Sequence, residues 1–344
     1  MPPPVTVQVN PFSKILIVKP SSLGDVVHSL PVLDAIKGTY PDSVVHWVIA
    51  KGFEGLLEGH PMINRLIVIS KDQWKRPLRF WHTGREFQML FKTLRAEGYD
   101  LVIDLQGLFR SAVITLAAGS PLRIGFSDAR ECSPIFYTHT TEGGGDIHAV
   151  DRYLKIAGLL GCKTEQVRFP LPNFRPSEEI HQLVNSLNRY ITLIPGARWQ
   201  TKRWPPKYFA ELLELLVQHA VILGTVEDSE AGAFIKDRCG KRVIDLTGRT
   251  TLKDAVYILK NSLAVITNDT GPMHIAAALN RPIIALFGPT SPLRTGPYGS
   301  NNTVIVSSKV DCAPCYKKSC QNMACMNTIS VHEVYSHCKN VLGL

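Results

Sequence analysis

The sequence lacks any long apolar run. None of its 344 residues fall in an uncharged apolar stretch of about 18 residues or more, so no segment is expected to span a membrane. The N-terminus has neither the basic start nor the apolar stretch of a signal peptide. We therefore expect a cytoplasmic protein.

Acidic residues are also scarce relative to basic ones. The chain has 29 Asp and Glu against 38 Lys and Arg, which gives a net charge of +9. Such an excess favours anionic partners: nucleic acid, phosphorylated small molecules or an anionic membrane surface. No recognised nucleic-acid-binding module occurs, so we expect no nucleic-acid partner.

Two nucleotide-binding signatures are missing as well. The sequence contains neither the Walker pattern nor GxGxxG, which argues against a P-loop and against the dinucleotide fingerprint of a Rossmann domain. What is present is a globular composition, with 45% hydrophobic and 19% charged residues. The length suits two domains of about 150 residues each.

Short β-branched runs alternate with helix-like stretches along the whole chain, which predicts βαβ units and parallel sheets. The expected strands are 14–19, 43–50, 65–70, 100–104, 190–195, 220–224, 242–246, 263–269 and 282–288. The expected helices of the second half are 205–218, 228–238, 251–260 and 272–280. A proline-rich linker at 169–179 separates the two patterns. The fold class is therefore α/β, with two doubly wound domains at 1–170 and 171–325 and a final helix within 326–344.

In parallel sheets, ligands bind beyond the carboxyl ends of the strands, so the loops that follow strands are the candidate sites. The first is 20–25, where Gly24 permits a tight turn before a helix and Asp25 follows. Asp25 is compatible with a helix cap as well as with a catalytic carboxylate.

A second loop, 195–205, crowds three cations into six residues, among them Arg198 and Lys202. Such a cluster suits a diphosphate, although a solvated basic turn remains the alternative. A third loop, 268–274, starts a helix whose free N–H groups would bind an anion beside His274. In the turn 224–228, Asp228 would either accept hydrogen bonds from ribose hydroxyls or cap the following helix.

The stretch 74–85 mixes basic and aromatic residues. We interpret it as an acceptor-side surface that meets phosphates and the membrane interface, with a solvated amphipathic helix as the alternative. Arg123 is a weaker candidate for the same role. The expected acceptor-binding residues are Lys75, Arg76, Arg79, Arg85, Arg110 and Arg130.

Four of the eight cysteines are closely spaced near the C-terminus. In the order Cys312, Cys315, Cys320 and Cys325, they could hold zinc or an iron–sulfur cluster, but the spacing fits zinc ribbons only in part. Reduced structural thiols and a local disulfide are the alternatives.

The loops together resemble glycosyltransferase family 9, the heptosyltransferases of lipopolysaccharide inner-core synthesis. The matching pieces are ILIVKPSSLGDVVHSLPVL, YDLVIDLQGLFRSA, PGARWQTKRWPPKYFAEL and NDTGPMHIAAALNRPIIALFGPTSP. They extend over nearly the whole chain. The first-domain pieces are most similar to heptosyltransferase I, whereas the cysteine-rich tail is more similar to heptosyltransferase II.

The resemblance implies a GT-B fold with two Rossmann-like domains facing a central cleft, and an inverting, metal-independent transfer. It implies ADP-L-glycero-D-manno-heptose as donor, with no required cofactor, and Kdo-lipid A as acceptor, at the inner face of the cytoplasmic membrane. By its motifs, Asp25 would be the general base and Lys202 would contact the donor phosphates. The expected donor-site residues are Ser22, Gly24, Gly196, Ala197, Arg198, Thr201, Lys202, Asp228, Thr250, Leu252, Asp269, Thr270, Gly271 and His274.

The chain departs from the family pattern at Ala197 and Arg198, where members of this subtype often have hydroxyl residues. The mixed resemblance leaves other readings open: a different nucleotide-sugar, a later core acceptor, or a non-catalytic nucleotide- or metal-binding regulator. In the enzymatic reading, domain closure brings Asp25 to the donor and excludes water. The final helix is expected to pack back on the first domain.

Overall fold

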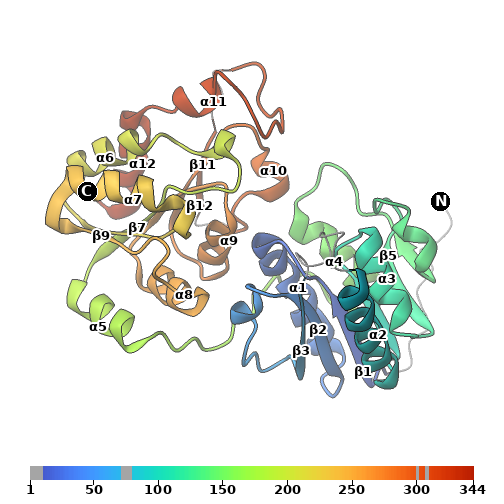
Figure 1. Cartoon of the computed structure of the whole chain (residues 1–344). Coiled ribbons are helices and arrows are strands. Elements are labelled where there is room, and N and C mark those ends of the chain that lie inside the picture. Colours follow the sequence, from blue (N-terminus) through green and yellow to red (C-terminus); the bar gives the residue numbers. More distant parts are fainter. Residues whose placement is uncertain (1–10, 71–79, 300–301, 307–309) are drawn as a thin grey trace. The chain divides into compact units, whose positions relative to one another are not determined.

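The computed structural model describes residues 11–70, 80–299, 302–306 and 310–344 (Figure 1). The chain divides into two compact units, residues 1–173 and 174–344. None of the helices described has the length and apolar character that crossing a membrane requires.

The first unit is a six-stranded parallel sheet with the order β3-β2-β1-β4-β5-β6. Its strands are β1 (Lys14–Val18), β2 (Val44–Ala50), β3 (Arg65–Ile69), β4 (Leu101–Asp104), β5 (Leu122–Phe126) and β6 (His139–Thr141). Its helices are α1 (Leu23–Thr39), α2 (Phe80–Ala96), α3 (Phe109–Ala117) and α4 (Ala149–Leu159). The expected strands of this half are present, and β5 and β6 extend the sheet beyond them.

The central strand β1 is buried on both faces, as expected for a parallel strand. Leu16 and Val18 pack in a core cluster with Leu94 of α2 and Ile114 of α3. The alternate residue Ile17 is fully buried too, and α1 packs on α4. The continuous apolar run of β1 thus packs against helices on both faces of the sheet.

The second unit repeats this arrangement, with the strand order β12-β11-β10-β7-β8-β9. Its strands are β7 (Tyr190–Ile194), β8 (His219–Ile222), β9 (Val243–Asp245), β10 (Val265–Asn268), β11 (Ile283–Phe287) and β12 (Asn302–Val306). Its helices are α5 (Glu178–Leu187), α6 (Pro206–Leu215), α7 (Ser229–Cys239), α8 (Leu252–Asn261), α9 (Gly271–Ala278), α10 (Pro292–Thr295), α11 (Ala324–Asn327) and α12 (Val331–Leu342).

The last helix belongs to the second unit. In α12, Val334 and Cys338 are fully buried in one core cluster with Trp204 and Phe209 of the second unit. The helix also packs on α6. The apolar face of α12 thus completes the core of the second unit, and its expected packing on the first domain stays a prediction.

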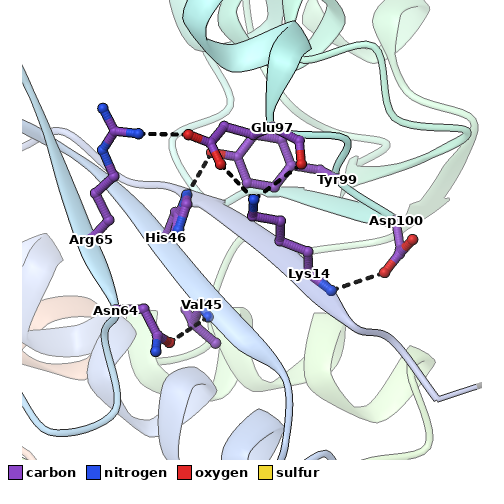
Figure 2. A network of polar contacts seen from close by, with 8 residues as sticks. All are labelled: Lys14, Val45, His46, Asn64, Arg65, Glu97, Tyr99 and Asp100. Carbon is purple, nitrogen blue, oxygen red and sulfur yellow. Dashed lines mark hydrogen bonds and ion pairs between the residues drawn. The ribbon is translucent and has the colours of Figure 1, made fainter.

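A polar network joins the strands of the first unit near their amino ends (Figure 2). Glu97 accepts from Lys14 Nζ and from Arg65, each at 2.5 Å. His46 Nδ1 lies 2.8 Å from the Tyr99 hydroxyl. Because ligands of parallel sheets bind at the opposite, carboxyl edge, we assign this network to the stability of the sheet.

Candidate active site

Each parallel sheet has a point where the strand order reverses, between β1 and β4 in the first unit and between β7 and β10 in the second. Connections leave such a pair of strands toward opposite sides, which opens a crevice at the carboxyl edge. Three of the four loops expected to contain the chemistry follow β1, β7 and β10, and the fourth, 224–228, follows the neighbouring strand β8. The topology therefore places the candidate residues where α/β proteins bind ligands.

Asp25 is the third residue of α1, and Ser22 is the N-cap. The Ser22 N–H and hydroxyl both donate to Asp25 Oδ2, at 3.0 and 2.7 Å. Such a capping box pairs N–H donors that would otherwise lack a partner at the N-terminus of the helix, so Asp25 does act as a helix cap. Asp25 nevertheless stays half-buried rather than fully enclosed, which is compatible with a second role as a base.

Two residues that the sequence did not single out act on the other oxygen of this carboxylate. The Tyr153 hydroxyl from α4 donates to Asp25 Oδ1 at 3.2 Å. Lys19, at the end of β1, donates from Nζ to the same hydroxyl at 2.8 Å. The position of Lys19 directly after a strand is a signal that could have identified it; Tyr153 has no comparable signal.

The loop after β4 is organised by Asp104, which is completely buried. Its Oδ1 accepts from the N–H groups of Gln106 and Gly107, and its Oδ2 accepts from the Tyr137 hydroxyl at 2.8 Å. Burial raises the pKa of Asp104, and these hydrogen bonds oppose that rise. Gln106 Oε1 then accepts from Ser21 N–H at 3.3 Å, which holds this loop against the loop before α1.

The acceptor-side candidates fall into three groups. Arg110 and Arg130 are exposed and follow β4 and β5, at the carboxyl edge of the sheet. Lys75, Arg76 and Arg79 lie outside the described residues, and Arg85 is placed only as part of α2.

Arg123 has a structural role. Its guanidinium donates to the carbonyl oxygens of Phe136 and Ser120, at 2.9 and 2.7 Å. Through these bonds the Arg123 side chain holds the backbone around β5, and a role of Arg123 at the acceptor site stays a prediction.

In the second unit, Lys202 forms an ion pair with Asp269. Lys202 Nζ lies 2.6 Å from Asp269 Oδ2, and the Thr290 hydroxyl donates to the same oxygen at 2.7 Å. The Trp199 ring lies 4.6 Å from Lys202 Nζ, measured to the ring centroid. Loops after β7, β10 and β11 thus meet at one buried carboxylate. Thr290 was not predicted, although its position after strand β11 could have identified it as a candidate site residue.

The N-terminal end of α9 adjoins this ion pair. Thr270 is the N-cap, and Gly271 and Pro272 open the helix. The N–H groups of a first helical turn favour a negative charge. His274 lies in that turn and is buried. The structure therefore brings a cation and a helix N-terminus together, as the sequence predicted for an anion site.

The rest of the loop after β7 is fixed by its neighbours. The Ala197 carbonyl accepts from Arg203 Nε at 2.8 Å, and the buried Thr201 donates to the Lys317 carbonyl at 2.8 Å. Arg198 is exposed. Lys318 Nζ lies 5.5 Å from the Trp199 ring centroid. The cysteine-rich segment therefore supports the basic loop.

Asp228 is buried and already has partners. Its Oδ2 accepts from the Thr225 N–H and hydroxyl, at 2.9 and 3.0 Å, and its Oδ1 lies 3.4 Å from the Arg203 guanidinium. A Cβ on Gly196 would lie 2.3 Å from the Asp228 carboxyl carbon. These contacts support the capping alternative for Asp228, and the exposed acid of this turn is Glu227.

Thr250 and Leu252 flank Thr251, the N-cap of α8. Both are partly exposed, and their loop is joined to the turn at 224–228 by the Gly248 N–H, which donates to the Gly224 carbonyl at 2.9 Å. The residues expected around the nucleotide thus lie on neighbouring loops at the carboxyl edge of the second sheet.

The eight cysteines are free thiols. Across the described part of the chain, no group of three or more His, Cys, Asp or Glu side chains is arranged to hold a metal ion. Cys325 is buried against Gly288. Cys320 accepts backbone hydrogen bonds from Asn322 and Met323, which lower its thiol pKa.

Comparison with known proteins gives one consistent result. Residues 87–325 match the family model for glycosyltransferase family 9 (heptosyltransferase). Lipopolysaccharide heptosyltransferase 1 of Pseudomonas aeruginosa is 32% identical over 321 residues, which are 89% of this chain and 87% of that protein.

Two solved structures show the same fold over nearly their whole lengths. E. coli heptosyltransferase WaaC with ADP has a TM-score of 0.79 and 24% identity, and the match covers 95% of this chain and 99% of that one. E. coli ADP-heptose lps heptosyltransferase II has a TM-score of 0.76 and 26% identity, with 96% and 98% covered. The fold is thus GT-B, and the chain belongs to glycosyltransferase family 9, the heptosyltransferases.

Proposed function

We propose that this protein transfers L-glycero-D-manno-heptose from ADP-heptose to the Kdo-lipid A inner core of lipopolysaccharide, with inversion and without a metal. The observation that supports this most is the Lys202–Asp269 ion pair at the N-terminus of α9. It provides a preorganised cation beside helix N–H groups where a departing diphosphate accumulates charge. The WaaC relative was solved with ADP, which supports an adenine nucleotide as the donor.

In this proposal the two units divide the reaction. The transition state of glycosyl transfer resembles an oxocarbenium ion, and negative charge grows on the leaving ADP. Lys202 and the first turn of α9 stabilise that charge. Asp25 of the first unit takes the proton from the acceptor hydroxyl as the new bond forms. Arg110 and Arg130, which are exposed at the same edge, bind the anionic acceptor.

Substitution of the base is the direct test. Asp25→Asn should abolish heptose transfer from ADP-heptose to Kdo-lipid A, because the amide cannot accept the proton. ADP affinity, measured by calorimetry, should change less than about twofold, since the nucleotide binds the second unit. Full activity of Asp25→Asn would exclude Asp25 as the base, and loss of ADP binding would indicate a structural role for it.

Two further measurements test the metal independence and the stereochemistry. Transfer should persist in EDTA, and the anomeric configuration of the product, determined by NMR, should be inverted.

A second candidate keeps the chemistry and changes the acceptor. The chain matches both heptosyltransferase 1 and heptosyltransferase 2 proteins, and the cysteine-rich segment was the part most similar to the second type. Parallel assays with Kdo-lipid A and with an acceptor that already has one heptose distinguish them. A thermal-shift comparison of ADP, UDP and GDP tests the donor base.

We further propose that the protein works at the inner face of the cytoplasmic membrane. Its net charge of +9 favours anionic lipid surfaces. Vesicles containing about 30% anionic lipid should bind the protein at low salt and release it at roughly 0.5 M salt, because screening weakens such attraction. Vesicles of neutral lipid are the control, and equal binding to both would contradict the electrostatic basis.

A further inference from the structure

A line of three side chains leads from the interior of the first unit to Asp25. Lys19 Nζ donates to the Tyr153 hydroxyl at 2.8 Å, and that hydroxyl donates to Asp25 Oδ1 at 3.2 Å. The three residues come from the end of β1, from α4 and from the start of α1. Residues distant in sequence therefore converge on one carboxylate oxygen.

The chemistry of lysine sets the direction of this line. An ammonium group has three donors and no acceptor, so the tyrosine oxygen must accept from Lys19. The single hydroxyl proton is then directed toward Asp25. A neutral lysine could accept that proton instead, and Asp25 would lose a donor. The charge of Lys19 thus controls whether Tyr153 supports the carboxylate.

Burial of the Lys19 ammonium group is unfavourable for the stability of the fold. It is 2% exposed, and a buried ammonium is unfavourable unless its donors and charge are satisfied. Besides Tyr153, Nζ donates to the Leu105 carbonyl at 2.9 Å and lies 4.6 Å from the Tyr153 ring centroid. A methionine could occupy a similar volume without this desolvation. A buried cation at this place is thus better explained by the carboxylate it faces than by packing.

Several charged and titratable groups surround this line. Burial lowers the pKa of Lys19, Asp25 and Asp104 raise it, and Arg152 and Arg130 lower it further. On α1, the His28 ring lies edge-on to His148, the N-cap of α4, with ring centroids 5.1 Å apart. The histidines titrate near pH 6.5 in model compounds, so the test compares variants that all retain them.

We propose that Lys19, acting through the Tyr153 hydroxyl, orients Asp25 and keeps it ionised as the base of the transfer reaction. This rests on the proposed function, since it assumes that Asp25 accepts the acceptor proton. Lys19 and Tyr153 are positioning residues: neither reacts, and their effect reaches the substrate through Asp25 alone.

The test is the pH dependence of kcat for Lys19→Met and Tyr153→Phe, measured from about pH 3.5 to pH 9 so that the acid limb of an aspartate lies within the range. Loss of the positive charge in Lys19→Met, or of the hydroxyl donor in Tyr153→Phe, should move the acid limb of the pH profile upward by about one pH unit, because a nearby opposite charge and a hydrogen bond to the ionised form both lower a carboxylate pKa. On the acid limb itself kcat should fall about tenfold, because a shift of one pH unit changes the ionised fraction of a carboxylate about tenfold below its pKa, while the KM for the donor and the affinity for ADP change less than about twofold.

Two matched controls lie in the same unit, in the network of Figure 2. Lys14→Met removes a lysine from the same strand, one that pairs with Glu97. Tyr99→Phe removes a buried hydroxyl that bonds to His46. Both should lower thermal stability and leave the acid limb in place.

The outcomes separate the two proposals. An acid limb for Lys19→Met and Tyr153→Phe that coincides with that of the controls overturns the positioning role, even if kcat falls. If Lys19→Met does not fold, Tyr153→Phe decides alone, because phenylalanine retains the shape of tyrosine. If Asp25→Asn transfers heptose normally, the proposed base is wrong whatever the two variants do.

Discussion

Lys202 and Asp269 form an ion pair beside the N-terminus of α9, at the proposed anion site. Both side chains are largely buried, with exposures of 17% and 5%. Removing one partner of such a pair leaves an uncompensated charge, which is strongly unfavourable. Breaking the pair is therefore unfavourable unless another anion replaces Asp269 beside Lys202.

Lys202→Met should lower kcat/KM for the donor by about 10²- to 10³-fold, the usual cost of losing one charge-stabilising donor. ADP affinity should fall as well, in calorimetric titration. Lys207→Met is the control, because Lys207 is an exposed cation of the following helix whose Nζ contacts Tyr208. Equal losses in both variants would indicate that net charge alone matters.

Individual residues also show which parts of the candidate site can be predicted from the sequence and which cannot. Asp25, Lys202 and Asp269 could be proposed because each follows a strand of recognisable pattern. Tyr153 could not, because it lies 128 positions from Asp25 and nothing in a helical pattern says which distant loop its hydroxyl reaches. The positions of site residues were predictable, whereas the partners that hold them were not.

At the scale of elements, the turn between β8 and α7 depends on the absence of a side chain at Gly196. The Asp228 carboxylate fills the space that a Cβ would occupy, and the same carboxylate holds Thr225 and Arg203. Two loops of the candidate donor site are thus fixed by one close approach.

Gly196→Ala should destabilise the protein by about 1–3 kcal/mol, the usual cost of overpacking, and should weaken ADP binding, because the turn must move. Chemical denaturation and calorimetry measure the two effects. Gly158→Ala, where a Cβ meets nothing within 4 Å, should be neutral or slightly stabilising in α4. Unchanged stability and affinity of Gly196→Ala would show that the turn adjusts without cost.

Three strands were missed by the sequence patterns, β5, β6 and β12, and the first two of these are short or interrupted. β5 contains Arg123 and Gly125 within five residues, and β6 has three residues with no apolar member. Both lie at one edge of the sheet, where pairing with a neighbouring strand, rather than an apolar run, makes them strands. The central strands, which are buried on both faces, were predicted because burial requires a continuous apolar sequence.

At the scale of the whole molecule, buried tyrosines are found in both units. Burial raises the pKa of Tyr99 and Tyr153 in the first unit and of Tyr190 in the second. The folded protein thus keeps these phenols protonated where the unfolded chain releases the proton. Their contribution to stability is complete below about pH 10 and is lost as pH rises above it.

We expect the free energy of unfolding to fall above pH 10 by about 1.4 kcal/mol per pH unit for each such tyrosine. Tyr190→Phe should be less stable than the natural protein at pH 8, because the hydroxyl donates to the Ile258 carbonyl at 2.6 Å. Its stability should nevertheless fall less steeply above pH 10. Urea unfolding at several pH values measures both, and parallel curves would contradict the assignment.

The ion pair between Lys202 and Asp269 has a consequence for turnover under the proposed function. When ADP departs after transfer, Lys202 does not return to an empty, dry environment, because Asp269 stands 2.6 Å away and takes its place as counterion. Product release is thereby eased, and product inhibition is moderated, by an anion that belongs to the enzyme itself.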